Sequence, residues 1–431
     1  MIVLATINAK YIHSSFALRY LKANLKEFEE KTTIIEFNPD DKTNDVAEKI
    51  LSYKPQYVGL SIYLWNVEAI KKVIQIIKSV APDVKIIIGG PEVDDTIDSD
   101  WTIYGEGEFA FYDIIKNNPK ERFISKCIPD LSQIKMPYYL YKEDDIKNRM
   151  VYVESTRGCP FSCEFCLSSN SDGVRFFDVD LFLSNMKILL DKGLKHFKFI
   201  DRTFNLKFAH CKKILDFFYD NYVEGLVLHF EVFPDKISEQ LMSEIKRFPQ
   251  GALHLEAGIQ TFFEPSLKLI SRKQDEEKTL KNLDYIMHQT GADIHADLVF
   301  GLPASTIQTI EIDFNKIIKL KPQELQLGIL KKLKGAPIKR HDETHQMKYY
   351  AFPPYEILQT KDISFNDMQR LKRFARYFDL FYEYVKEEMW LFDKWLKFSD
   401  FVWETYKQTH KISEKRRLEI LNNFKEREIN D

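Results

Sequence analysis

The chain has 431 residues, 44% of them hydrophobic, and its formal net charge is −3. This length favours two or three domains, and the near-neutral charge argues against nucleic acid as a partner, because there is no global basic field. No run of eighteen apolar residues is present, which predicts no transmembrane helix and no membrane partner. Five cysteines and an N-terminus without the basic start of a signal peptide predict a cytoplasmic protein.

Residues 1–120 alternate between strand-like and helix-like patterns. Strands are expected at Ile2–Ile7, Thr33–Phe37, Tyr57–Tyr63, Lys85–Ile88 and Trp101–Tyr104, and helices at Phe16–Phe28, Val46–Tyr53, Val67–Val80 and Phe109–Lys116. This alternation predicts a Rossmann-like α/β domain, in which helices cover both faces of a parallel sheet. Ligands of such sheets bind beyond the carboxyl ends of the strands.

Polar residues and glycines follow four of these strands. Glycine lets a ligand approach the backbone closely, but the loops contain neither Gly-x-Gly-x-x-Gly nor a phosphate-binding Gly-Lys-Ser/Thr. The loops therefore predict a binding edge without a dinucleotide fingerprint. Its candidate residues are Asn8, Tyr11, His13, Ser61, Tyr63, Asn66, Gly89, Gly90, Gly105 and Glu106.

Residues 121–149 are expected to be a linker. Pro129, Pro137 and the charged run Lys142–Asp145 interrupt any periodicity, and the segment shows no evident chemistry.

Three cysteines lie within eight residues, at Cys159, Cys163 and Cys166. A structural zinc site needs four ligands, whereas a cubane iron–sulfur cluster uses one thiolate per iron. Three thiols would therefore hold three irons and leave the fourth iron open to another ligand. The alternatives are a zinc site with a distant fourth ligand and three unrelated thiols.

Residues 150–335 repeat short apolar strands at strand-plus-helix spacing, which predicts a partial (β/α)6 barrel. After the strand that precedes the cysteines, the expected strands are His196–Asp201, Leu226–Val232, Leu253–Gln260, Asp293–Phe300 and Glu324–Leu330. Polar residues occupy the carboxyl ends of these strands or the segments after them: Asp201, Glu231, Gln260, Arg272 and Asp297. Charged residues on buried strands need partners, so these positions are candidates for ligand binding or for salt bridges within the barrel.

Residues 336–431 are expected to form a helical domain rich in aromatic residues, including Trp390, Trp395 and Trp403. These side chains predict either a helix core or a stacking wall for a flat substrate.

The cysteine spacing, with Phe165 directly before the last cysteine, resembles the signature of the radical S-adenosylmethionine (SAM) superfamily. The resemblance implies a [4Fe-4S] cluster whose open iron binds SAM and whose electron cleaves it to a 5'-deoxyadenosyl radical. The strand-end residues resemble the subgroup that includes oxygen-independent coproporphyrinogen dehydrogenase. This likeness implies SAM contacts from Phe165, Asp201, Glu231, Gln260, Arg272 and Asp297. The chain departs from the subgroup at Asp201-Arg202-Thr203, where a Gly-Gly-Glu or Gly-Gly-Gly-Thr turn is usual.

The four loops of residues 1–120 resemble the cobalamin-binding domain that precedes many radical SAM cores. The resemblance implies that the ten loop residues named above bind cobalamin. The Asp-x-His-x-x-Gly motif that supplies a histidine to cobalt elsewhere is absent, so cobalamin is expected without a lower-axial histidine. A purely structural domain is the alternative. The C-terminal part resembles a helical domain of uncharacterised function that follows such cores.

Together these resemblances imply a cobalamin-dependent radical SAM enzyme that methylates an unactivated carbon of a small-molecule or peptide substrate. An external electron donor such as flavodoxin or ferredoxin is implied as its partner. One alternative is a radical SAM enzyme, with or without cobalamin, that performs a rearrangement, cyclisation or oxidation. Another is a non-enzymatic iron–sulfur or cobalamin sensor or carrier.

Overall fold

The computed structural model describes residues 1–170 and 173–430, and the side chains of all of these except 125–127, 170 and 430. The chain forms two compact units. The first comprises Met1–Arg157, Arg175–Ile200 and Tyr222–Leu226, and the second Gly158–Val174, Asp201–Asn221 and Val227–Asp431. Within the described residues, no helix has both the length and the apolar character needed to cross a membrane.

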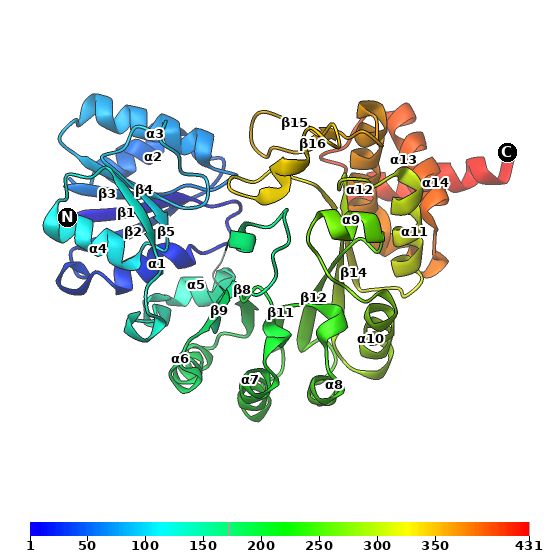
Figure 1. The fold of residues 1–431 in the computed structure, drawn as a ribbon, viewed down its shortest axis with the longest axis horizontal. Helices are drawn as coiled ribbons and strands as arrows, with labels where there is room; N and C mark the ends of the chain where they lie inside the picture. The colour runs from blue at the N-terminus through cyan, green and yellow to red at the C-terminus, as the bar shows by residue number, and fades with distance from the viewer. Residues whose placement is uncertain (171–172, 431) are drawn as a thin grey trace. The chain divides into compact units, whose positions relative to one another are not determined.

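A six-stranded parallel sheet forms the N-terminal part of the first unit, as the alternating pattern predicts (Figure 1). Its strand order is β2-β1-β3-β4-β5-β6. The strands are β1 (Ile2–Ile7), β2 (Thr32–Phe37), β3 (Tyr57–Ser61), β4 (Lys85–Gly89), β5 (Trp101–Gly105) and β6 (Phe123–Cys127). The helices are α1 (Phe16–Ala23), α2 (Thr43–Leu51), α3 (Val67–Val80) and α4 (Glu108–Asn117).

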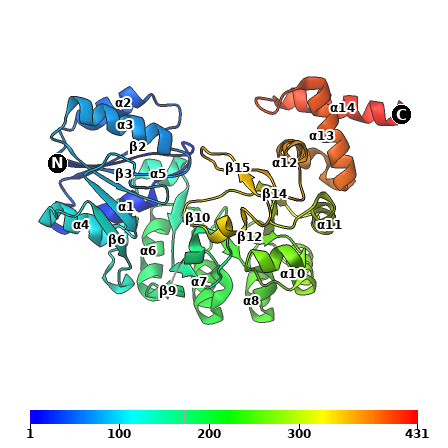
Figure 2. The same cartoon turned by 45° about the horizontal axis from the view of Figure 1, so that its top comes forward.

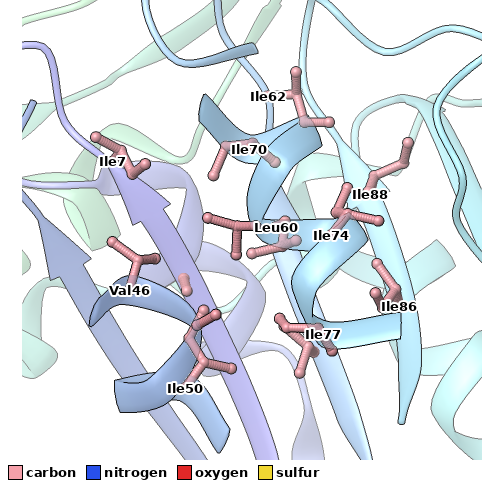
Figure 3. Packing of buried hydrophobic residues seen from close by; sticks show 14 of the residues in the cluster. Ile7, Val46, Ile50, Leu60, Ile62, Ile70, Ile74, Ile77, Ile86 and Ile88 are labelled. Carbon is pink, nitrogen blue, oxygen red and sulfur yellow. The ribbon is translucent and has the colours of Figure 1, made fainter. Parts of the chain in front are cut away.

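The helices cover both faces of this sheet and bury one apolar layer on each. Ile70, Ile74 and Ile77 recur at helical spacing on α3 and pack with Leu60 of β3 and Ile50 of α2 (Figure 3). The opposite face is packed by residues of α1 and α4. Each fully buried aliphatic side chain contributes roughly 1.5–3 kcal/mol of transfer free energy. The buried layers fix the strands, and thereby the loops at their carboxyl ends.

The segment expected to be a linker has elements of its own. Strand β6 extends the sheet, and α5 (Glu143–Asn148) follows it. Arg19 of α1 ion-pairs with Asp145 of α5 at 3.0 Å and with Glu36 of β2 at 3.1 Å, and its side chain is only 5% exposed. These buried ion pairs attach α5 to the sheet domain.

The six strands expected between residues 150 and 335 all form. In the first unit, β7 (Val151–Val153) pairs in parallel with β10 (His196–Phe199), and α6 (Val179–Asp191) lies between them in sequence. In the second unit, β11 (Val227–Val232), β12 (Leu253–Gln260), β13 (Asp293–Phe300) and β14 (Glu324–Ile329) pair in parallel in chain order. Up to β14, the helices of this unit are α7 (Phe208–Asp220), α8 (Glu239–Ile245), α9 (Glu264–Leu269), α10 (Glu276–Gln289) and α11 (Ile307–Ile318).

Strands β11, β12 and β13 alternate strictly between buried and half-buried residues. Because successive side chains point to opposite faces, one face is apolar and the other carries histidines and carboxylates. The cysteine motif begins at the last residue of β8 (Thr156–Cys159) and continues into the segment before β9 (Gly173–Phe176), and these two short strands form a separate sheet. Residues 158–174 are called the cluster loop below.

The C-terminal region is helical, as expected. After the hairpin of β15 (Lys348–Tyr349) and β16 (Ile357–Gln359) come α12 (Phe365–Val385), α13 (Phe392–Tyr406) and α14 (Glu414–Asn430) (Figure 2). Trp390 and Trp395 are 3% and 2% exposed, and both rings contact Phe398. Of the two interpretations of these aromatics, the structure supports a packed helix core.

Candidate active site

One cavity of about 170 Å³ in the second unit brings together the three cysteines and most of the residues predicted to bind SAM. Five of those six residues line it: Phe165, Glu231, Gln260, Arg272 and Asp297. Its other lining residues are Cys159, Phe161, Cys163, Cys166, Arg202, Thr203, Val232, Phe233, Glu256 and Gly258. Residues from the cluster loop to β13 therefore converge on a single concave site.

Asp201 is the predicted SAM-binding residue that the structure does not place in the cavity wall. It is 1% exposed, while the next two residues, Arg202 and Thr203, line the cavity. The chain bends just after β10, which ends at Phe199, and this bend brings Arg202 and Thr203 into the cavity wall while Asp201 stays buried.

Two arginines contact the cysteine sulfurs. Arg272 Nη1 lies 3.5 Å from Cys163 Sγ, and Arg202 Nη2 lies 3.7 Å from Cys166 Sγ. Burial raises the pKa of the Cys163 thiol, and the charge of Arg272 opposes that rise. A neighbouring cation favours the thiolate, which is the form that binds metal. The arginines therefore favour the protonation state that a cluster requires, and Arg202 is a site residue that the sequence did not predict.

Carboxylates face these cations from adjacent strands. Glu231 of β11 and Glu256 of β12 are register partners, and Asp297 of β13 is the partner of Gly258. Glu231 ion-pairs with Arg202 at 3.3 Å. The cavity thus combines anionic and cationic groups, as a zwitterionic ligand with an ammonium and a carboxylate requires.

A bulge in β12 shapes the wall beside Arg272. The register of β12 with β13 shifts between Gly258 and Gln260, and Gln260 adopts a positive φ of 72°. A Cβ atom on Gly258 would lie 2.7 Å from Gln260 Nε2. Arg272 Nη2 donates to the carbonyl of Gly258. The absence of a side chain at Gly258 therefore leaves the space that the Gln260 amide occupies.

Glu164, inside the cysteine motif, is a buried anchor that the sequence analysis missed. Its carboxylate accepts from Ser271 Oγ at 2.6 Å and lies 3.0 Å from His341 Nε2, and it also ion-pairs with Arg340. Its backbone bonds to Ile270 and Ile338. A carboxylate between two of the three clustered cysteines was the available signal, because such a residue needs partners when buried.

Replacing Glu164 by glutamine is expected to destabilise the protein by about 1–3 kcal/mol, because buried partners lose a charged acceptor. The cluster loop then loses its attachment, so iron content after reconstitution is expected to fall. Thermal unfolding and an iron count test both effects. The exposed Glu239 on α8 provides a matched Glu→Gln control that should change neither. Unchanged stability and iron content in Glu164→Gln would contradict the anchoring role.

The residues predicted to bind cobalamin follow β1, β3, β4 and β5, which are neighbours in the sheet, so they share its carboxyl edge. Some of them hold the loops in shape. Asn66 is 1% exposed and donates to the carbonyls of Ile7 and Ser61. Asn8 donates to the carbonyl of His13 at 2.8 Å. A role in binding for these two residues remains a prediction.

Other features of this edge fit a large, flat, partly apolar ligand. Trp65 stacks on Tyr63 with ring centroids 4.6 Å apart and is 55% exposed, and Tyr11 is 50% exposed. A Cβ on Gly89 would meet nothing nearer than 3.9 Å, so the backbone there is open to close approach. Gly90, at φ 111°, instead packs against the carbonyl of Ile62. Exposed aromatic surface of this kind marks interaction sites.

Glu106, the last of these predicted residues, already binds two arginines at the ends of the cluster loop. Arg157 Nη1 lies 2.8 Å from Glu106 Oε2, and Arg175 ion-pairs with the same carboxylate. Arg157 also contacts Glu108 at 2.7 Å and Glu154 at 2.8 Å. Both ends of the cluster loop are therefore held at one carboxylate.

Known proteins show the same combination of parts. The B12 binding domain family matches residues 2–115, the radical SAM superfamily residues 153–317, and a protein family of unknown function, DUF4080, residues 343–431. The uncharacterized methyltransferase PH0819 of Pyrococcus horikoshii is 25% identical over 362 residues, which cover 72% of this chain and 74% of that protein.

Two solved structures share the fold. The cobalamin-dependent SAM radical enzyme OxsB, with aqua-cobalamin and SAM bound, superposes with a TM-score of 0.69 at 12% identity, over 99% of this chain and 70% of that one. The radical SAM methyltransferase TsrM of Kitasatospora setae, with tryptophan and a SAM analogue bound, gives 0.65 at 14% identity, over 84% and 80%. The chain is a radical SAM enzyme with an N-terminal B12-binding domain and a C-terminal domain of unknown function.

Proposed function

We propose that this enzyme is a cobalamin-dependent methyltransferase that methylates an unactivated carbon of its substrate. The observation that carries the proposal is the convergence of three thiols, two arginines and three carboxylates on one cavity in a chain that also contains a B12-binding domain. The relative from Pyrococcus horikoshii and the structure of TsrM, both named as methyltransferases, support methyl transfer.

The cavity residues fit a [4Fe-4S] cluster and SAM. Cys159, Cys163 and Cys166 supply three thiolates and leave one iron open to the amino and carboxylate groups of SAM. Glu231 and Asp297 offer acceptors for the amino N–H groups and ribose hydroxyls of SAM. Arg272, 7% exposed, offers its remaining Nη1 N–H to the carboxylate.

The carboxyl edge of the N-terminal sheet fits cobalamin without a histidine on cobalt. His13 is the one histidine in residues 1–157, and its Nδ1 lies 2.5 Å from the hydroxyl of Tyr152. That contact orients the ring within the protein. The edge therefore binds the corrin through Trp65, Tyr11 and the open backbone at Gly89.

Cobalamin supplies a methyl carrier, and the cluster supplies the electron that cleaves SAM. For each methylated product two SAM molecules are consumed. One gives its methyl group and leaves as S-adenosylhomocysteine, and the other yields methionine and 5'-deoxyadenosine, which carries the substrate hydrogen. This balance requires two electrons from an external donor such as flavodoxin or ferredoxin. The substrate is a small molecule or a peptide.

The test is anaerobic reconstitution of the full chain with iron, sulfide and hydroxocobalamin, followed by desalting. We expect about four irons per chain and a retained corrin absorption band. With SAM and a reductant, S-adenosylhomocysteine and 5'-deoxyadenosine should both accumulate. A phenylalanine at Gly89 would occupy the open edge, so Gly89→Phe should lose the corrin and keep the irons.

Other outcomes would contradict parts of the proposal. Four irons without corrin in the unaltered chain would indicate that the N-terminal domain is a scaffold. The enzyme would then be expected to perform a rearrangement, cyclisation or oxidation. Corrin binding and a loaded cluster without SAM cleavage would favour a sensor or carrier.

A further inference from the structure

A layer of histidines lies on the polar face of the second unit's strands, two residues before the carboxylates that line the cavity. His229 of β11 and His254 of β12 are register partners, and so are His295 of β13 and Glu324 of β14. The cavity residues Glu231, Glu256 and Asp297 follow two positions later on their strands. Neither the cluster nor SAM accounts for this layer, because none of the residues 229, 254, 295 and 324 lines that cavity.

Three of these side chains bring metal-binding atoms together. One donor atom each of His254, His295 and Glu324 lies within 4.8 Å of the other two. Within this group, His295 Nδ1 is 3.0 Å from Glu324 Oε2. Two imidazoles and one carboxylate are a donor set that suits zinc and non-haem iron.

We infer that His254, His295 and Glu324 bind a divalent transition-metal ion such as zinc. The site does not depend on the proposed methyl transfer. Its ligands come from three adjacent strands, which fix the backbone positions more rigidly than loops do.

The surroundings of His295 match those of a metal-ligating histidine. Its other nitrogen, Nε2, lies 3.3 Å from Asp297 Oδ1. Ligating histidines almost always donate their second N–H to a carboxylate or carbonyl, which fixes the ring and its tautomer.

His254 is oriented from the other side by His229, whose ring stacks on it with centroids 4.5 Å apart. His229 Nε2 in turn lies 2.8 Å from Glu256. Asp297 and Glu256 both line the cavity that contains the three cysteines. A single layer of side chains would therefore separate the ion from that cavity.

The site also has room for further ligands. His295 and Glu324 line a second cavity of about 620 Å³, bounded by β14 and by Lys372, Arg376 and Tyr382 of α12. Three protein ligands leave a position open in a four-coordinate site. Water or an anionic group within this cavity can complete the coordination.

A proton competes with the metal for His295. Burial opposes a charge on this ring, but the carboxylates of Asp297 and Glu324 raise its pKa to about 10. The structural alternative is therefore an imidazolium between two carboxylates. Because a metal must displace the proton, binding should be tighter at higher pH. Retention of zinc by the protein distinguishes the metal-bound state from this salt-bridged state.

The test uses the full chain with its cluster loaded, so that the three cysteines are occupied. Excess Zn²⁺ is added at pH 8, the protein is desalted, and zinc and iron are counted by mass spectrometry. We expect about one zinc beside about four irons, and a zinc K-edge spectrum with nitrogen and oxygen ligands and no sulfur. His254→Ala and Glu324→Gln should weaken zinc binding at least about tenfold.

His288→Ala is the matched control. His288 is an exposed histidine on α10, 3.2 Å from Asp284, so it reports adventitious binding by surface His–Asp pairs. Glu324 has a 59% exposed side chain, so Glu324→Gln should fold even where His254→Ala does not. No retained zinc, zinc bound through sulfur, or equal retention in the unaltered chain and Glu324→Gln would overturn the site and leave His295 as a salt-bridge partner.

Discussion

Alanine at Cys163 is expected to abolish cluster assembly and SAM cleavage without unfolding the protein. Cys163 is the buried member of the three cysteines and the one that Arg272 contacts. A cubane held by two thiolates lacks a protein ligand on a second iron, so 5'-deoxyadenosine formation should fall by at least about 10³-fold, or roughly 4 kcal/mol in activation free energy. Iron analysis after reconstitution and a SAM cleavage assay measure the two losses.

Cys211→Ala is the control for this substitution. Cys211 is also fully buried, but its thiol donates to the carbonyls of Phe204 and Lys207 and does not line the cavity. It should keep the iron content and the cleavage rate of the unaltered chain. Full iron content in Cys163→Ala, or its loss in a folded Cys211→Ala, would show that the cluster is bound elsewhere.

The Arg19→Met substitution is expected to cost about 3 kcal/mol of unfolding free energy, because it leaves two carboxylates buried without their shared cation. Those carboxylates are Glu36 and Asp145, both less than 11% exposed. Arg149 also contacts Glu36, at 3.3 Å, which limits the loss. Urea unfolding followed by circular dichroism measures it.

Lys71→Met tests whether any lost ion pair has this effect. Lys71 pairs with Glu68 at 3.3 Å on the surface of α3, with side chains 37% and 60% exposed. Such a pair contributes at most about 1 kcal/mol. If Arg19→Met and Lys71→Met lost similar amounts of unfolding free energy, the buried ion pairs of Arg19 would contribute no more to stability than a surface pair.

Regular patterns made most of the fold predictable. The expected bounds of β12 and β13 agree with the observed ones, because β12 alternates polar and apolar residues throughout and β13 does so from Asp293 to Leu298. Strand β6, Phe-Ile-Ser-Lys-Cys, was missed because it contains few large apolar residues and follows the charged run Lys120-Glu121-Arg122. Helix α5, Glu-Asp-Asp-Ile-Lys-Asn, has no apolar stripe, and its position depends on Arg19, which lies 126 residues earlier.

The site residues were predictable where their spacing along the sequence, within a motif or at the end of a strand, indicates their role. The cysteine motif and the strand-end residues Glu231, Gln260 and Asp297 do meet in one cavity. Arg202 and Glu164 were missed because their partners are distant in sequence: Cys166 is 36 residues from Arg202, and His341 is 177 from Glu164. Asp201 was chosen over Arg202 because sequence alone does not show which of two neighbouring residues faces inward.

The shared carboxylate of Glu106 adds a second connection between Arg157 and Arg175, which flank the cysteine segment, beside the pairing of β8 with β9. Closing a chain segment of this length costs roughly 2–3 kcal/mol in chain entropy, and the pairing of β8 with β9 and the ion pairs of Arg157 and Arg175 together offset that cost in the metal-free protein. Glu106 lies within the part of the chain that matches the B12 binding domain. A core expressed without that domain would keep the pairing of β8 with β9 but lose this second connection, so we expect the N-terminal domain to contribute to iron loading.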